Sequence, residues 1–187
     1  MNNNKILAVY NTCGINSDNT DWYISSLKSM LAQNLDNCRV VLSSCKNSTD
    51  CIKKIYQEFG NKISYSLTPE LHTVNITFNK AVQESVKKFG EFDGYMYVDS
   101  GCTFDDQNDI FSLSHKTLVE NNYGIVVVQT DTDECLENLG YPYLYESKHI
   151  QVTGEHLVVP IGTSVNQHTA VFSNQIFKKY KKLYPHL

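Results

Sequence analysis

Short apolar runs alternate with amphipathic segments along the first 130 residues of the chain. The apolar runs cover residues 5–10, 39–42, 62–67, 95–98 and 124–129, and each has the length of a buried strand. Between the runs, apolar residues recur at spacings of three and four, the period of a helix with one buried face. Strands that alternate with helices indicate a mostly parallel, doubly wound α/β sheet.

The same spacing predicts which side of each helix packs against the sheet. Gly60 and Gly90 end the second and third helices, because glycine readily adopts the left-handed conformation found at helix ends. We expect four inward-facing sets, which are Tyr23, Leu27, Met30 and Leu31; Ile52, Ile55, Tyr56 and Phe59; Phe78, Ala81, Val82, Val86 and Phe89; and Ile110, Leu113, Thr117 and Leu118.

The pattern changes after residue 130. Residues 146–169 have the character of a β-hairpin region around a glycine turn, and 163–172 predict a further strand. A last amphipathic helix follows, and Ser173 is its expected N-cap. Since no repeat or linker divides the chain, we expect a single domain over residues 1–187, with one half at 1–130 and a second at 131–187.

Composition excludes some classes of protein. The 187 residues are 41% apolar and carry a net charge of −4, which gives no support for nucleic-acid binding. No apolar run approaches the length of a membrane span, and the run at 6–10 is too short for a secretion signal, so we expect a cytoplasmic protein. The six cysteines form no Cys-x-x-Cys pair and indicate reduced thiols.

Polar residues follow the expected strands where a parallel sheet would bind a ligand. Ligands of open α/β sheets lie outside the carboxyl ends of the strands, which right-handed crossovers bring to one rim. Asn11, Ser43, Ser44, Asp99 and Gly101 would gather there. The Asp99 carboxylate can hold a divalent cation or a sugar hydroxyl, and Gly101 lets a ligand approach the backbone. The alternative is that these residues only form turns.

Several motifs of nucleotide-binding and hydrolytic enzymes are absent from the sequence. No Gly-x-Gly-x-x-Gly follows the first strand, and no phosphate-binding loop of the Gly-x-x-x-x-Gly-Lys type occurs. There is no Gly-x-Ser-x-Gly elbow, and the six histidines show no His-x-x-x-His spacing. Dinucleotide-binding domains, phosphate-loop enzymes and α/β-hydrolases are therefore disfavoured.

Four segments carry a likeness to a known family. They are Ala8 to Asn11 at the end of the first strand, Trp22 to Gln33 in the first helix, Val40 to Asp50 around the second strand, and Tyr97 to Gly101 after the fourth. In order and spacing they resemble the nucleotide-sugar glycosyltransferases of the A-type fold, especially the inverting family 2. Tyr97 to Gly101 stands where that family has its Asp-x-Asp motif.

The resemblance implies a Rossmann-like sheet and a metal-assisted transfer of a sugar from a nucleotide-diphosphate donor to a hydroxyl acceptor such as a glycan. It places the nucleoside against Tyr10 or Asn11 and Ser43 or Ser44, and Mn²⁺ or Mg²⁺ on Asp99. Residues 1–130 would form the nucleotide-binding half. Residues 131–187 would form an acceptor-side half that ends before the segment that holds the family's catalytic base.

The chain departs from the family at chemically important positions. Ser43 and Ser44 replace the acids that usually contact the nucleobase, and Gly101 replaces the second acid of Asp-x-Asp. No residue is assigned as the catalytic base, and the sequence does not indicate an oligomeric state. The alternative is a non-catalytic domain of the same fold that binds a sugar nucleotide or glycan or acts as a scaffold. A nucleotidyltransferase ranks third, because residues 11–19 contain one glycine and no Lys or Arg.

Overall fold

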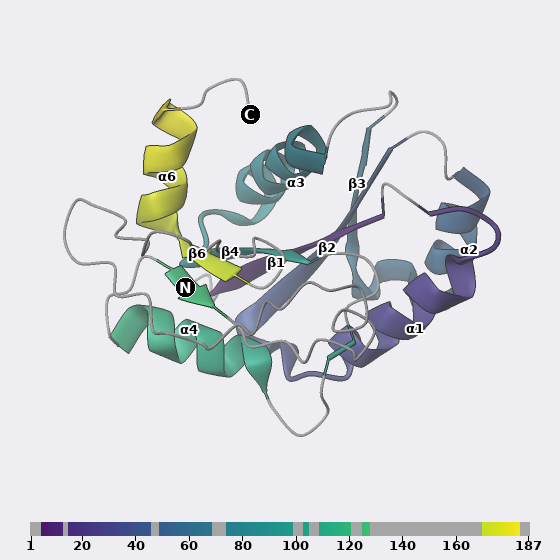
Figure 1. Cartoon of the computed structure of the whole chain (residues 1–187), viewed down its shortest axis with the longest axis horizontal. Helices are drawn as coiled ribbons and strands as arrows, with labels where there is room; N and C mark the ends of the chain where they lie inside the picture. Colours follow the sequence, from purple (N-terminus) through teal and green to yellow (C-terminus); the bar gives the residue numbers. More distant parts are fainter. Residues whose placement is uncertain are drawn as a thin grey trace, which may run out of the picture.

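A computed structural model describes residues 5–12, 15–45, 49–68, 74–98, 103–104, 109–120, 125–127 and 170–183. These segments form a six-stranded sheet with helices on both faces (Figure 1). The predicted α/β class and mostly parallel sheet are confirmed. The expected hairpin region at 146–169 lies outside the described residues.

The strands of the sheet follow the order β3-β2-β1-β4-β6-β5. β1 pairs in parallel with both β2 and β4, and β2 pairs in parallel with β3. β6 lies antiparallel between β4 and β5, so the other five strands share one direction. The strands are β1 (Ile6–Asn11), β2 (Cys38–Cys45), β3 (Ser64–Thr68), β4 (Gly94–Val98), β5 (Ile125–Val127) and β6 (Ala170–Ser173).

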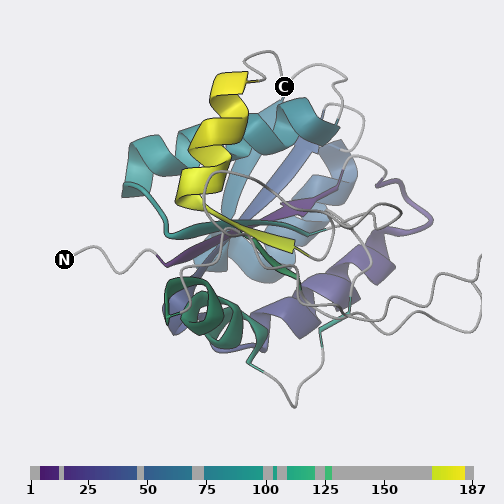
Figure 2. The same ribbon diagram turned by 60° about the vertical axis from the view of Figure 1, so that its left-hand side comes forward.

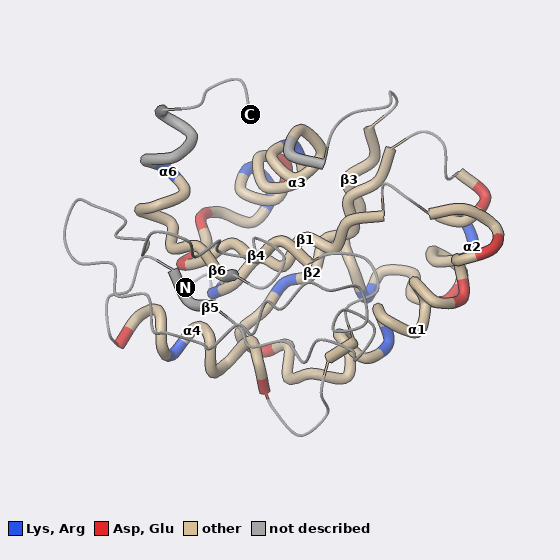
Figure 3. Tube along the Cα trace, in the orientation of Figure 1, with Lys and Arg blue, Asp and Glu red and all other residues tan. Residues whose placement is uncertain are grey.

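Helices cover the two faces of this sheet in two groups. α3 and α6 lie on one face, and α1 and α4 lie on the other, with α2 beside the β3 edge (Figures 1 and 2). Acidic and basic residues are interspersed over these helices (Figure 3). The helices are α1 (Thr20–Leu31), α2 (Thr49–Phe59), α3 (Val74–Phe89), α4 (Ile110–Glu120) and α6 (Asn174–Leu183), with short 3₁₀ turns η1 (Leu35–Asn37) and η3 (Gly60–Lys62).

β1 supplies side chains to two separate cores. All six of its residues are buried. Ile6, Ala8 and Tyr10 belong to a core with α1, α2 and α4, whereas Leu7 and Val9 belong to a core with α3. Because side chains alternate along a strand, a strand covered on both faces needs an unbroken apolar run, and this explains the run at 5–10.

The predicted inward faces of the helices are confirmed in most positions and wrong in two. Tyr56 is 53% exposed and Leu113 is 60% exposed. On α4 the buried residues are Phe111, Ser114 and Leu118, so the helix is rotated from the predicted face toward Phe111. The predicted cap of the last helix is confirmed, because the Ser173 hydroxyl accepts a hydrogen bond from the Ile176 amide (3.3 Å).

None of the helices that the structure describes combines the length and the apolar character needed to cross a bilayer.

β6 passes close to β4 where β4 has a glycine. A Cβ atom at Gly94 would lie 2.9 Å from Val171 Cγ1 on β6 and 3.0 Å from Leu118 Cδ2 on α4. Carbon atoms meet favourably at 3.5–4.0 Å, so a larger residue at position 94 would push these side chains away. Gly94 therefore permits the close approach of β6.

Gly94→Ala should destabilise the chain by about 1–3 kcal/mol, the usual cost of overpacking a core. Urea unfolding measures the change. Val171→Ala is the matched reference, and in the double variant it should recover part of the loss, because it removes the atom that the new methyl group meets. Strictly additive effects of the two substitutions would contradict the packing of β6 against Gly94.

Candidate functional site

The carboxyl ends of β1, β2 and β3 bring three polar side chains into one row. Asn11 is in register with Ser43, and Ser43 with Ser66. Residues in register on parallel strands point to the same face, and the neighbouring Val9 and Val41 belong to the α3 core. We call Asn11, Ser43 and Ser66 the polar row; it lies on the α3 face of the sheet, at the rim where the sequence predicts a ligand.

Asn11 is held in place by a contact that crosses from β1 to β4. Its side-chain amide donates a hydrogen bond to the Tyr97 hydroxyl (2.8 Å), and its side chain is almost completely buried. The Tyr97 ring packs edge-on against Phe78 of α3, with ring centroids 5.8 Å apart. The Asn11 amide therefore has a fixed position beside the end of β4.

Thr12 fastens the chain to the rim directly after β1. Its backbone amide and its hydroxyl both donate to the Ser43 carbonyl oxygen, at 2.9 and 3.0 Å. Both lone pairs of that carbonyl are thus used, so a ligand that comes to Ser43 has only its side-chain hydroxyl left to bond with.

Three buried hydroxyl groups at this rim have no hydrogen-bond partner within the described structure. They belong to Ser43, Ser66 and Thr68, and the Ser43 side chain is only 1% exposed. A buried polar group without a partner costs about 1–3 kcal/mol, so such groups are few in native proteins. Their concentration at the ends of β2 and β3 marks this part of the rim as a place where a further hydrogen-bonding group would be stabilised.

The structure separates the predicted nucleoside contacts into two pairs. Asn11 and Ser43 lie together in the polar row, but Tyr10 and Ser44 point to the opposite face of the sheet. Tyr10 is completely buried and its hydroxyl donates to the Tyr23 carbonyl (3.3 Å). It therefore affects the site indirectly, by packing under the end of β1. The Ser44 hydroxyl donates to the Cys45 carbonyl (3.4 Å) and faces α2.

Asp99 and Gly101 lie outside the described residues. They follow Val98, the last residue of β4, whose Cα is in register with that of Tyr10. Within the described segments, no group of three or more His, Cys, Asp or Glu residues could hold a metal ion. The assignment of a metal to Asp99 stays a prediction.

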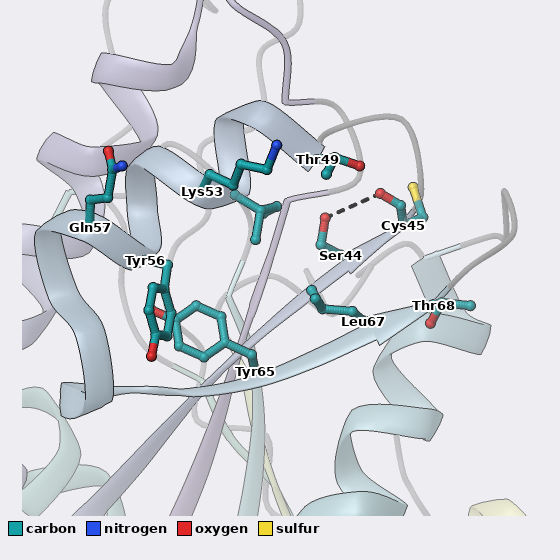
Figure 4. A pocket seen from close by; sticks show the side chains of 10 residues that line it. Ser44, Cys45, Thr49, Lys53, Tyr56, Gln57, Tyr65, Leu67 and Thr68 are labelled. Carbon is teal, nitrogen blue, oxygen red and sulfur yellow. Dashed lines mark hydrogen bonds between the residues drawn. The ribbon is translucent and has the colours of Figure 1, made fainter.

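A groove of about 630 Å³ lies between α2 and β3, at the end of the sheet away from β4 (Figure 4). We call it the α2–β3 groove. The sequence does not predict this groove, because the helical period places Tyr56 in the core and no pattern indicates that β3 would be left half covered. The residues that line it are Ser44, Cys45, Thr49, Ile52, Lys53, Tyr56, Gln57, Tyr65, Leu67 and Thr68.

Two tyrosines form one end of the α2–β3 groove. The rings of Tyr56 and Tyr65 are tilted by 54° with centroids 5.4 Å apart, and the Tyr65 hydroxyl donates to the Gly60 carbonyl (3.1 Å). Partial burial, and then the neighbouring Tyr56, raise the pKa of Tyr65 above its ordinary value. The Tyr65 hydroxyl is therefore neutral near pH 7, which suits an uncharged ligand.

Comparisons with known proteins place this arrangement in a recognisable fold. No family model and no curated protein sequence matches the chain. A mannosyltransferase, PcManGT from Pyrobaculum calidifontis, solved in complex with GDP-Man and Mn²⁺, matches with a TM-score of 0.52 and 13% identity over 68% of this chain. A 4-diphosphocytidyl-2C-methyl-D-erythritol synthase from Anaerococcus prevotii matches with a TM-score of 0.56 and 13% identity over 99% of this chain.

At this identity the likenesses show the fold. The chain has the Rossmann-like sheet of the A-type glycosyltransferases, as the sequence resemblance implied. It spans 36% of the length of the mannosyltransferase and 77% of the length of the synthase. A sugar transferase and a synthase of a cytidine diphosphate compound thus share this architecture.

Ser43→Ala and Ser66→Ala should leave the stability of the ligand-free chain unchanged or raise it by up to about 1 kcal/mol, because each removes a buried hydroxyl that has no protein partner to lose. Thr12→Val is the matched control. It removes a buried hydroxyl that does donate a bond, and should lower stability by about 1 kcal/mol. Urea unfolding compares the variants. A loss at Ser43→Ala as large as at Thr12→Val would show an internal partner for the Ser43 hydroxyl.

Proposed function

We propose that this chain is a glycosyltransferase domain that binds a nucleotide-diphosphate sugar at the carboxyl rim of its sheet and transfers the sugar to a hydroxyl acceptor. The observation that carries the proposal is the polar row, in which buried and partly unpartnered side chains from three parallel strands meet next to the end of β4. The fold it shares with a mannosyltransferase supports this assignment.

The nucleoside would lie against Asn11 and Ser43. A hydroxyl group can donate and accept hydrogen bonds, so Ser43 suits the neutral edge of a nucleobase or the hydroxyls of a ribose. Ser44 points to the other face of the sheet, toward α2, and takes no part in this contact. Binding would relieve the cost of the unpartnered hydroxyl, which gives the ligand a favourable contribution beyond its own contacts.

The diphosphate would lie closer to β4. Neighbouring strands are about 4.8 Å apart, so the ends of β2 and β4 are separated by about 10 Å across β1. This span suits a ligand with its nucleoside at β2 and its phosphates at β4. Asp99, beside Gly101, is the acid that the sequence places there.

A divalent cation, Mn²⁺ or Mg²⁺, would fit Asp99 as one carboxylate ligand, with phosphate oxygens and water completing its coordination. The described residues alone do not form a metal site. When bound, the cation would neutralise the charge that develops on the departing diphosphate. The similar mannosyltransferase was solved with GDP-Man and Mn²⁺, which supports this class of donor and metal.

Nucleotidyl transfer is a second candidate, because the similar synthase covers nearly the whole of this chain. That reaction starts from a nucleoside triphosphate, whose three phosphates need a cluster of donors or cations. The segment after β1, residues 11–19, has no Lys or Arg.

A non-catalytic domain that only binds a sugar nucleotide or glycan would use the same site without turnover.

Thermal unfolding with a panel of nucleoside diphosphates and their sugar conjugates, with and without Mn²⁺, tests the proposal. A ligand at about 100 times its Kd should stabilise the native state by about 2.7 kcal/mol, seen as a higher Tm. Asp99→Asn, which keeps the shape and removes the charge, should abolish the Mn²⁺-dependent part of the shift, and Ser43→Ala should weaken binding without lowering the Tm of the free chain.

Glu120→Gln is the control for this experiment, because it removes the same charge from an exposed position on α4. It should leave the shift unchanged. Release of pyrophosphate from a nucleoside triphosphate would favour nucleotidyl transfer, and binding of sugar nucleotides without any turnover would favour the non-catalytic domain. No shift with any nucleotide would overturn the proposal.

A further inference from the structure

The α2–β3 groove exposes two large apolar side chains around one hollow. Leu67 is 52% exposed on β3, and Tyr56 is 53% exposed on α2. Ile52 and Ile55 of α2 are buried in the core that also holds residues of β1 and β2, whereas the edge strand β3 keeps Leu67 exposed and Tyr65 partly exposed. Leu67 is in register with Ser44, which places the floor of the groove directly beside the rim of the sheet.

The lining of the groove is apolar along its floor and polar at its ends. Figure 4 shows Tyr56 and Tyr65 side by side at one end, Gln57 farther along α2, and Ser44 and Thr49 at the other end. A cavity of this size with apolar walls and a few polar groups is typical of a small-ligand site.

Charge restricts the kind of ligand. None of the lining residues is acidic, and the one cation among them, Lys53, forms an ion pair with Asp50 of its own helix (2.9 Å). A phosphate or carboxylate would find no free positive charge among these residues, and an ammonium group would find no negative charge. The groove therefore suits a neutral molecule that has an apolar face and hydroxyl groups at its edge.

The groove is distinct from the polar row. Leu67 and Ser44 face α2, whereas Asn11, Ser43 and Ser66 face α3 on the opposite side of the same rim. A ligand in the groove would thus lie beside the proposed donor site without occupying it.

We propose that the α2–β3 groove binds a neutral sugar ring of a glycan. The apolar face of the ring packs on Tyr65 and Leu67, and the exposed Tyr56 ring closes one side, since an aromatic ring offers a large rigid apolar surface next to a polar hydroxyl. The hydroxyls of the sugar bond with Gln57 at one end and with Thr49 at the other. This binding site goes beyond the proposed transfer reaction and does not depend on it.

Saturation-transfer NMR on the full chain tests this proposal with methyl glycosides of glucose, galactose, mannose and N-acetylglucosamine, together with maltose and cellobiose. No nucleotide or metal is added, so the donor site takes no part. At least one glycoside should receive magnetisation, most strongly at the protons of one ring face. Tyr56→Ser and Leu67→Ser should each weaken its binding by about fivefold or more.

Both substitutions replace exposed side chains, so the variants should unfold at nearly the wild-type urea concentration. Trp22→Ser is the matched control, because Trp22 is an equally exposed aromatic residue on α1, outside the lining of the groove, and it should leave binding unchanged.

Three results would overturn the proposal. They are the absence of transfer to every glycoside, transfer that Tyr56→Ser and Leu67→Ser leave intact, and preferential binding of free nucleosides that Tyr56→Ser abolishes. The last result would identify the groove as a nucleobase pocket. The nucleotide titration tests substitutions of Asp99 and Ser43, whereas this experiment tests substitutions of Tyr56 and Leu67. Failure of one proposal is therefore distinguishable from failure of the other.

Discussion

The parallel pairing of β1 with strands on both sides is the constraint on which the rest of the structure depends. Its register sets Asn11 beside Ser43 on one side, and on the other sets Val9 beside Tyr97, whose hydroxyl then reaches the Asn11 amide. A slip of one residue would exchange the faces of every side chain on β1 and would turn Tyr10 toward α3 and Asn11 toward α1. The apolar run of β1 thus determines both cores and the position of the polar row.

The rim of the sheet has different chemistry on its two faces. On the α3 face, amide and hydroxyl groups are buried and held close to the backbone, which suits a ligand recognised by hydrogen bonds. On the α2 face, an aromatic pair and an exposed leucine surround an open groove, which suits a ligand recognised by its apolar surface. The two faces of one rim therefore suit two unlike ligands.

The order of the elements and the positions of Asn11 and Ser43 could be predicted from the sequence, because strand periodicity and chain order decide which residues reach a carboxyl rim. The exposure of Tyr56 could not be predicted, since an apolar residue at helical spacing is buried only if a neighbour covers it, and α2 lies at the β3 edge of the sheet. Ser43 and Ser44 point to opposite faces because side chains alternate along a strand. This could not be predicted from the sequence, where the serines are expected to break the strand, whereas β2 continues through Cys45.

The place of β6 between β4 and β5 affects how the polypeptide can acquire its structure during synthesis. Among the described strands, β5 pairs only with β6, which emerges from the ribosome much later. β1 to β4 can assemble as soon as all four have been made, since they pair with one another without β5 or β6. β5 must wait for a long-range contact, and such contacts form slowly because they close a large loop. Completion of the β5 edge is therefore a late step of folding, and until β6 has been made one edge of β4 is without its strand partner.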